Sequence, residues 1–208
     1  MTRAFVIAGT DTGVGKTCFS AALVDALTAF YWKPVQAGLE DETDSQAVMR
    51  LSGAAPERIV PEAWRLTLPA SPHISARAEG IAIDPARLVP PHVEGPLVIE
   101  TAGGVMVPLT DDVLTIDVLA RWGLPVILVA RTALGTINHS LLAIDALRRR
   151  GVPIHGVAFV GDKAEAQQQT IARIGGVRTL GRLPHLDPLT RESLREAFAC
   201  AFTVSDFT

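Results

Sequence analysis

The sequence of 208 residues contains only two cysteines, Cys18 and Cys200, which stand far apart without a motif around either one. This scarcity excludes a small fold held together by disulfides, and it predicts two reduced thiols in a cytoplasmic protein. The five histidines show no spacing typical of metal ligands, and no Ser-His-Asp or Cys-His arrangement stands out. The sequence therefore gives no indication of a zinc site or of a catalytic triad.

Long apolar runs and a strong net charge are also lacking. No stretch reaches the roughly 18 uncharged apolar residues that a membrane span needs, and Met1-Thr2-Arg3 leads at once into a strand-like run rather than a signal peptide. The net charge of −3 gives no support for binding to nucleic acid. We therefore expect no membrane or nucleic-acid partner. A length of 208 residues with 48% hydrophobic residues fits one globular domain over residues 1–208.

The clearest motif that is present is a glycine-rich stretch near the start, Gly-Thr-Asp-Thr-Gly-Val-Gly-Lys-Thr at residues 9–17. An apolar run over residues 4–8 precedes it and a helix-forming run over residues 19–29 follows, which is the Walker A arrangement. In such a loop, backbone N–H groups bind a polyphosphate, Lys16 adds a positive charge and the Thr17 hydroxyl binds Mg²⁺. The first glycine comes one residue earlier than the usual spacing. The alternative is an ordinary glycine-rich turn with an incidental lysine, which the two flanks argue against.

Beyond this loop, short apolar runs alternate with helix-forming stretches. The predicted strands are residues 4–8, 30–32, 97–99, 126–130, 156–160 and 177–180. The predicted helices are residues 19–29, 45–53, 71–79, 81–92, 114–122, 137–150, 164–174 and 189–200, and the proline-rich residues 54–72 are expected to be irregular. The central strands are apolar on both faces, so we expect a single α/β domain with a mostly parallel sheet and helices on both faces, of the P-loop NTPase type. Because residue 30 follows at once, the first helix either stops near Leu27 or joins the second strand unusually tightly.

Several polar residues follow predicted strands, where ligands bind in folds of this kind. Glu100 follows the apolar run 97–99, where an acid has little structural reason to stand, and its carboxylate is a candidate ligand for Mg²⁺. Lys33 ends the second strand and offers a second positive charge to a phosphate or an anionic intermediate, unless it only reaches out to solvent. For Asp44, a metal ligand and an acid favoured by the helix dipole both remain possible. The helix start at residues 135–138 offers free N–H groups to a carboxylate, as any helix start does.

Together, these motifs resemble those of the dethiobiotin synthetases, the ATP-dependent carboxylating enzymes of biotin synthesis. The resemblance rests on six stretches in the same order along the chain. They are Gly-Thr-Asp-Thr-Gly-Val-Gly-Lys-Thr at 9–17, Lys-Pro-Val-Gln-Ala-Gly at 33–38, Thr-Asp-Ser at 43–45, Pro-Ala-Ser-Pro-His at 69–73, Ile-Glu-Thr-Ala-Gly-Gly at 99–104 and Leu-Gly-Thr-Ile-Asn-His at 134–139. The first and last are characteristic of that family rather than of P-loop proteins in general.

The resemblance implies an activity and a set of partners. One amine of 7,8-diaminopelargonate would take up CO₂ as a carbamate, the carbamate would attack the γ-phosphate of ATP, and the second amine would close the ring, releasing dethiobiotin, ADP and phosphate. The implied cofactors are ATP and Mg²⁺. In this family the carboxylate of the substrate docks on the helix start of a second subunit, which here is residues 135–138. The resemblance therefore implies a homodimer with a shared substrate site.

The resemblance also implies roles for individual residues. Lys16 would hold the β- and γ-phosphates, Lys33 would bridge the carbamate and the γ-phosphate, and Mg²⁺ would be held by Thr17, Asp44 and Glu100. The implied nucleotide site comprises Gly13, Val14, Gly15, Lys16, Thr17, Cys18, Asp44, Glu100, Thr101, Ala102, Gly103, Pro184, His185 and Leu186. The implied diamine site comprises Thr12, Lys33, Ala37, Gly103, Gly135, Thr136, Ile137 and Asn138.

The sequence departs from the family pattern at four places. Ala37 stands where Ser or Thr is usual, and Thr101 replaces the commoner glycine after the metal-binding Glu. The Asn-Asp pair that reads the adenine base in many members appears as Val-Gly-Asp at residues 160–162. The sequence therefore does not indicate a nucleotide preference. The connection from the first helix to Lys33 is also shorter than usual by roughly four or five residues.

A second function from another class is a partition-type P-loop ATPase switch, which binds protein partners and makes no metabolite. Such proteins usually carry a second lysine early in the P-loop, and here that region reads Thr10-Asp11-Thr12. A cobyrinate-type amide ligase is a third possibility. It needs ammonia or a glutaminase domain, for which 208 residues leave no room.

Overall fold

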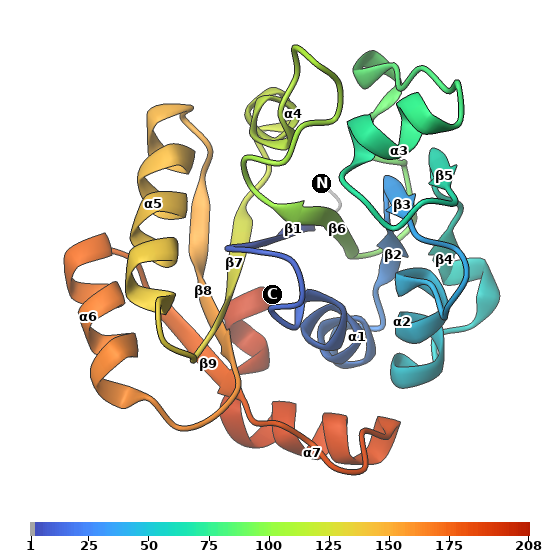
Figure 1. The fold of residues 1–208 in the computed structure, drawn as a ribbon. Coiled ribbons are helices and arrows are strands. Elements are labelled where there is room, and N and C mark those ends of the chain that lie inside the picture. Colours follow the sequence, from blue (N-terminus) through green and yellow to red (C-terminus); the bar gives the residue numbers. More distant parts are fainter. Residues whose placement is uncertain (1–2) are drawn as a thin grey trace.

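The computed structural model describes residues 3–208. Its centre is a seven-stranded sheet with the strand order β4-β2-β6-β1-β7-β8-β9, in which all neighbouring strands are parallel (Figure 1). The strands are β1 (Ala4–Gly9), β2 (Phe30–Trp32), β4 (Ile59–Val60), β6 (Leu97–Gly104), β7 (Val126–Arg131), β8 (Ile154–Val160) and β9 (Thr179–Leu183). A second, two-stranded parallel sheet is formed by β3 (Val35–Ala37) and β5 (Trp64–Leu66).

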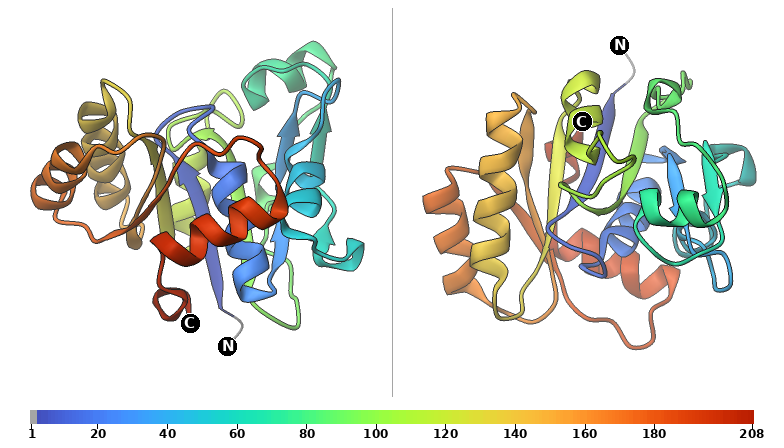
Figure 2. Two further views of the ribbon diagram at one scale, coloured as in Figure 1. Left: turned by 90° about the horizontal axis from the view of Figure 1, so that it is seen from below. Right: turned by 45° about the horizontal axis from the view of Figure 1, so that its top comes forward.

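Helices cover both faces of the large sheet (Figure 2). One face packs against α1 (Lys16–Leu27), α2 (Asp44–Ser52) and α7 (Arg191–Ala201). The other face packs against α4 (Thr115–Trp122), α5 (Thr136–Arg149) and α6 (Glu165–Gly175). The short α3 (Pro72–Ala78) packs against the β3–β5 sheet, and 3-10 turns lie at Pro56–Arg58, Pro85–Arg87 and Val204–Phe207. The predicted α/β architecture, a parallel sheet with helices on both faces, is confirmed.

The period of two along each strand explains why both faces are covered. In β1, Phe5 and Ile7 belong to the core under α1 and α7, whereas Val6 and Ala8 belong to the core under α4 and α5. All four side chains are buried. Because neither face of β1 carries a polar residue, a layer of helices on each side is the arrangement that removes its apolar surface from water.

The sharp passage from α1 into β2 agrees with the expectation of an early helix end. The helix stops at Leu27, and Thr28 takes a left-handed conformation with φ of 52°. The Ala29 N–H then donates to the Val24 carbonyl at 3.0 Å, which closes the end of the helix. As a result, β2 begins only three residues after the helix ends, and Lys33 follows it directly.

The proline-rich part of the chain differs from the prediction. Residues 54–72 were expected to be irregular, but they contain a 3-10 turn and the strands β4 and β5. These strands have two and three residues, and β3, which was also missed, has three. Elements this short carry no readable hydrophobic period. The helix expected over residues 81–92 is wrong, since only the 3-10 turn forms there; its three prolines, at positions 85, 90 and 91, lack the N–H groups that a helix needs.

Two strand boundaries also differ. The strand predicted for residues 97–99 continues to Gly104, so Glu100 lies within β6 and not after it. The last strand covers Thr179–Leu183, about two residues later than the predicted 177–180. The first helix begins at Lys16, three residues earlier than predicted. The remaining elements agree with the prediction to within about two residues at each end, the usual uncertainty of helix ends. No helix among residues 3–208 has the length and apolar character needed to cross a membrane.

Candidate active site

The glycine-rich loop leaves β1 and turns into α1 with two glycines in left-handed conformations. Gly13 has φ of 68°, and Gly15, the N-cap of α1, has φ of 93°. A Cβ atom at Gly15 would lie 2.7 Å from a methyl group of Val160 in β8, so only glycine fits there. No side chain caps the start of α1. Its first N–H groups are therefore left for a ligand, and the helix dipole adds a positive potential.

Lys16 lies inside the loop, and its position accounts for the glycine at residue 9, one residue earlier than the usual spacing. Its side chain is buried, and its Nζ donates to the Asp11 carbonyl at 3.0 Å. A Cβ atom at Gly9 would lie 2.9 Å from this Nζ and 2.7 Å from the Asp11 oxygen, so the first glycine of the motif makes room for the lysine. Burial, and next the positive charge of Lys33, lower the pKa of Lys16 from 10.5 to about 8.

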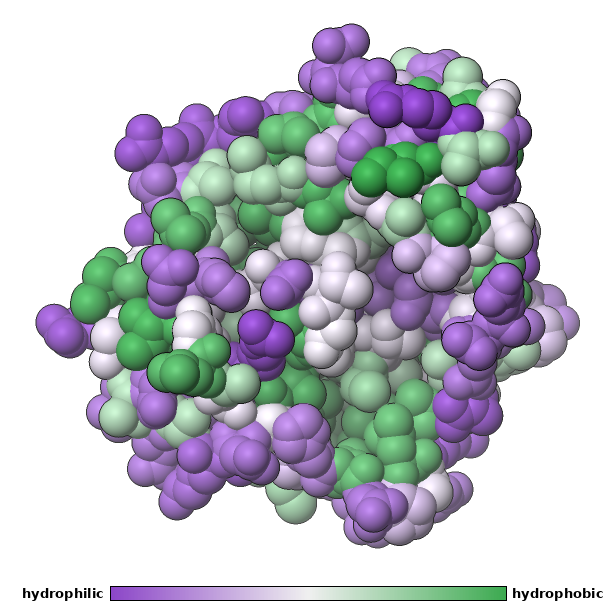
Figure 3. All heavy atoms as spheres, in the orientation of Figure 1, coloured by the Kyte–Doolittle hydropathy of each residue, from purple (hydrophilic) through white to green (hydrophobic). Residues whose placement is uncertain are grey.

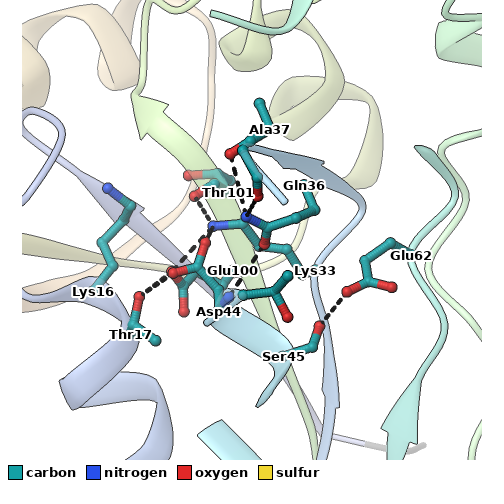
Figure 4. Close-up of polar contacts among 12 residues, drawn as sticks. Lys16, Thr17, Lys33, Gln36, Ala37, Asp44, Ser45, Glu62, Glu100 and Thr101 are labelled. Carbon is teal, nitrogen blue, oxygen red and sulfur yellow. Dashed lines mark hydrogen bonds and ion pairs between the residues drawn. The ribbon is translucent and has the colours of Figure 1, made fainter. Parts of the chain in front are cut away.

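A buried ion cluster lies beside the loop, centred on Lys33 (Figure 4). Its Nζ lies 2.7 Å from Asp44 Oδ2 and 3.1 Å from Glu100 Oε1, and it donates to the Thr101 carbonyl at 3.3 Å. Lys33 and Glu100 are 3% and 1% exposed. Burial by itself would lower the pKa of Lys33, but the charges of Glu100 and Asp44 outweigh it, and the pKa lies above 10.5. Lys33 is therefore a fixed ammonium at neutral pH.

The same carboxylates meet the hydroxyl of the P-loop threonine. Thr17 Oγ1 donates to Asp44 Oδ1 at 2.6 Å and lies 3.0 Å from Glu100 Oε1. Burial would raise the pKa of Asp44, but the charge of Lys33 and the hydrogen bonds from Lys33 and Thr17 hold the pKa below 3.8. The carboxylate therefore stays charged. Three oxygen donors therefore converge, which is the ligand type that Mg²⁺ prefers. Among residues 3–208 no group of three or more His, Cys, Asp or Glu side chains could hold a metal, so an ion here would need Thr17 and phosphate oxygens as well.

Two residues that the sequence did not single out hold the carboxylates in place. The Tyr31 hydroxyl, fully buried under the cluster, donates to Glu100 Oε2 at 3.1 Å. The Gln36 side chain accepts from the Asp44 N–H at 3.3 Å and donates to the Ala37 carbonyl at 3.2 Å. Neither role could be predicted from the sequence, because each depends on contacts between separate elements.

A cleft of about 1270 Å³, open solvent included, passes over this cluster. Its predicted lining residues are Thr12, Gly13, Gly15, Lys16, Thr17, Cys18, Lys33, Ala37, Asp44, Glu100, Ala102 and Gly103. Sequence reasoning missed Pro69, Ala70, Ser71, Pro72 and Val107, which also line it. The first four belong to the Pro-Ala-Ser-Pro-His stretch, so the signal was present but carried no assigned role. The structure thus brings together the P-loop, both lysines and both carboxylates.

The other nine predicted residues do not line the cleft. Val14 is buried in the hydrophobic core beneath the loop, and Thr101 is buried, with only its carbonyl reaching Lys33. The turn at residues 184–186 follows β9. It lies close to the end of β8, since a Cβ atom at Gly161 would lie 3.4 Å from the ring of His185. Because Val160 touches the P-loop, this turn and the end of β8 lie on one side of it. Residues 135–138 form the start of α5 and do not line the cleft.

The surface around the start of α5 is apolar. Leu134 is fully exposed, and Leu142 and Met106 are 62% and 49% exposed. Figure 3 shows hydrophobic side chains gathered over this side of the molecule, next to a hollowed centre. A second hollow lies beside the P-loop, and its lining includes Thr12, Met106 and His139. Three large exposed apolar side chains therefore lie on the side of the molecule that borders the P-loop.

The low pKa of Lys16 predicts a pH dependence. Because the lysine binds phosphate only as an ammonium, the affinity for ATP should fall as the pH rises through about 8, by on the order of tenfold between pH 7.5 and 9.5. Titration with a fluorescent ATP analogue over this range measures it. Lys16→Arg is the control, since its guanidinium stays charged and its affinity should not change across the range. Equal affinity of the unaltered chain at both pH values would contradict the role of Lys16.

Comparison with known proteins agrees with this geometry. A family model described as "AAA domain" matches residues 3–193. The protein named ATP-dependent dethiobiotin synthetase BioD from Agrobacterium fabrum is 60% identical over 207 residues, covering 100% of this chain and 98% of the relative. The protein of the same name from Afipia carboxidovorans is 59% identical over 209 residues, with full coverage of both.

Solved structures show a similar fold at low identity. A ParA family ATPase from Chlorobium tepidum has a TM-score of 0.53 at 13% identity, covering 96% of this chain and 91% of that one. The cell division ATPase MinD from Pyrococcus furiosus has a TM-score of 0.51 at 16% identity, covering 95% and 89%. These two likenesses establish the P-loop fold alone. The curated relatives, by contrast, are about 60% identical over the full length. This identity shows that the chain belongs to the ATP-dependent dethiobiotin synthetase family.

Proposed function

We propose that the protein carboxylates 7,8-diaminopelargonate with CO₂ and closes the ring to dethiobiotin at the expense of ATP. The observation that carries the proposal is the buried Lys33 ammonium between Asp44 and Glu100, beside the Lys16 of a P-loop. A P-loop alone binds a nucleotide. A second buried lysine at the same cleft adds a positive charge where a further anion must be held, which suits a substrate that becomes a carbamate.

The two lysines have separate tasks in this reaction. The amine lone pair attacks the carbon of CO₂, one C=O electron pair moves to oxygen, and the nitrogen loses a proton to solvent. The carbamate oxygen then attacks the γ-phosphate, ADP leaves, and the second amine displaces phosphate from the mixed anhydride. Every stage accumulates negative oxygens, so fixed positive charges stabilise the transition states most. Lys16 would neutralise the β- and γ-phosphates, and Lys33 would hold the carbamate against the γ-phosphate.

The geometry of Lys33 supports its role as a bridge. Its three N–H groups have three acceptors, one each on Asp44, Glu100 and Thr101. A substrate oxyanion would take the place of one of them, and the raised pKa keeps the ammonium charged throughout. Mg²⁺ bound by Thr17, Asp44 and Glu100 would supply further positive charge to the phosphates. Asp44 is already ionised, and hydrogen bonds already orient both carboxylates, before any substrate arrives.

We further propose that the active unit is a homodimer. The start of α5 does not line the cleft of its own chain, and the surface around Leu134 and Leu142 is apolar and exposed. Pairing through this surface would place the N–H groups of residues 135–138 at the cleft of the partner, where the carboxylate of the diamine would bind.

Sedimentation should give twice the monomer mass for the unaltered chain. Leu142→Asp should shift the mass to that of the monomer and lower activity in parallel.

The direct test is product formation. The purified protein, Mg-ATP, diaminopelargonate and radioactive bicarbonate should give labelled dethiobiotin and one ADP per product. The reaction should stop when any one of these components is left out. Absence of labelled product from a folded protein that binds ATP would contradict the proposal. Because the reaction consumes ATP, we place the protein in the cytoplasm. We also propose that residues 1–208 form a single domain.

A partition-type ATPase is the second candidate, since ParA and MinD proteins share the fold. However, where such proteins usually carry an extra lysine, this loop has Asp11, whose carboxylate lies 4.0 Å from Arg131. ATP hydrolysis separates the two functions. Stimulation by the diamine and not by DNA supports the synthetase, and the reverse result supports the switch.

A further inference from the structure

We propose that a small apolar cavity behind the cleft holds CO₂ before it reaches the amine, an inference that rests on the proposed function. The cavity lies between β6, the start of β3 and α4. Its wall toward the cleft includes Pro34, Thr101 and Ala102, and Ala102 lines both spaces. Pro34 follows Lys33 in the chain, and the Lys33 ammonium donates to the Thr101 carbonyl at 3.3 Å. The cavity therefore borders the place where the carbamate would form.

The wall of the cavity is mostly apolar. Its far side is formed by Val118, Leu119 and Trp122. The hydrogen-bond donors in the lining, Thr101, Thr115 and Trp122, each donate to a backbone carbonyl, at 3.4, 2.9 and 2.8 Å. A buried water needs two to four polar partners, and a cavity without them stays dry and takes up apolar molecules. The site is therefore built for a small, uncharged ligand.

Among the reactants, only CO₂ has these properties. The space that the centre of a water-sized sphere can occupy is about 20 Å³, against about 610 Å³ in the cleft by the same measure. This is room for one small molecule and too little for an adenine ring or a nine-carbon diamine. ATP, the diamine and bicarbonate are all charged, and moving a charge into apolar surroundings costs several kcal/mol. CO₂ carries no charge and no hydrogen-bond donor. A store beside the cleft would raise its local concentration when dissolved CO₂ is scarce.

Filling the cavity from α4 tests the proposal without touching the cleft. Val118→Phe should raise the KM for CO₂ about fivefold, while the kcat at saturating CO₂ and the KM values for ATP and diamine stay within twofold. Val118→Ile adds one methylene group and should give a smaller change in the same direction. The matched control is Val152→Phe, at a valine equally buried in the core on the α5 side, which should leave the KM for CO₂ unchanged.

Xenon gives a second measurement that needs no variant. It is apolar and binds dry cavities, so pressurised xenon should inhibit the unaltered enzyme competitively with CO₂ and not with ATP. The ¹²⁹Xe shift seen with the unaltered chain should be lost in Val118→Phe. If Val118→Phe does not fold, Val118→Ile and the xenon competition decide.

The inference would be overturned by an unchanged KM for CO₂ in a folded Val118 variant, or by xenon inhibition that CO₂ does not relieve. Equal changes in all three KM values would also overturn it, since they would indicate a general distortion of the cleft. Failure of the proposed function looks different, because the unaltered chain would then make no dethiobiotin at any CO₂ concentration.

Discussion

Replacing Lys33 with alanine is expected to lower the rate of dethiobiotin formation by at least about 10³-fold, while ATP binding changes only a few-fold. The reason is that in the proposed mechanism the P-loop, with Lys16, binds the nucleotide independently, whereas the buried Lys33 ammonium would supply the charge at the place where the carbamate meets the γ-phosphate. Loss of one preorganised electrostatic group from an active site typically costs 10²–10³-fold in kcat, and here a charged one is lost from a buried site. Product formation and ATP titration together measure this split.

The variant also leaves two carboxylates without their cation, so its stability needs a control. Removing one partner of a buried ion pair costs about 3–5 kcal/mol, and the thermal midpoint of Lys33→Ala should fall unless Mg²⁺ is present. Lys33→Met keeps most of the buried volume, and Lys163→Ala removes an exposed lysine that should matter to neither activity nor stability. Full turnover by a folded Lys33→Ala protein would show that the lysine is not at the reacting centre.

The sequence was sufficient for the parts of the fold that follow from a single period or a single motif. The run over residues 4–8 is apolar at every position, which gave a buried parallel strand, and the glycine-rich loop gave the first helix. The short strands β3, β4 and β5 carry too few residues to show a period, and they form only because α3 and neighbouring strands supply the rest of a core. In residues 81–92 the prediction placed a helix around residues 84–88, ahead of the break at Pro90-Pro91, and only the 3-10 turn at Pro85–Arg87 forms there.

The sequence was sufficient to predict the site residues that stand at or near the ends of strands. Lys33 stands directly after β2, where chemistry-bearing side chains collect in this fold. Glu100 was expected after its strand and lies inside β6, yet the parallel register sets it beside the P-loop because β6 is the neighbour of β1. Tyr31 and Gln36 escaped prediction for a different reason. Their hydrogen bonds join β2 to β6 and β3 to α2, and nothing in the local sequence shows that these elements will touch.

The glycine-rich loop gives the second large effect, through Gly15. Gly15→Ala is expected to weaken ATP binding by at least about 100-fold. Its Cβ atom would lie 2.7–2.9 Å from three atoms of the Val160 side chain, and its φ of 93° is unfavourable for any residue with a side chain. The loop would have to leave its present course, and with it the N–H groups at the start of α1 and the buried Lys16 would lose their alignment with the phosphates. Titration with an ATP analogue measures the loss.

A variant at Gly13 separates the effect of the clash with Val160 from the effect of backbone strain. Gly13 also has a left-handed φ, of 68°, but a Cβ atom there would meet nothing within 4 Å. Gly13→Ala therefore adds only backbone strain, about 1–2 kcal/mol, and should weaken ATP binding far less than Gly15→Ala. Adding Val160→Gly to Gly15→Ala removes the clash and leaves the strain, so the double variant should recover toward the level of Gly13→Ala. If Gly15→Ala bound ATP as the unaltered chain does, the close contact with β8 would not govern the shape of the loop.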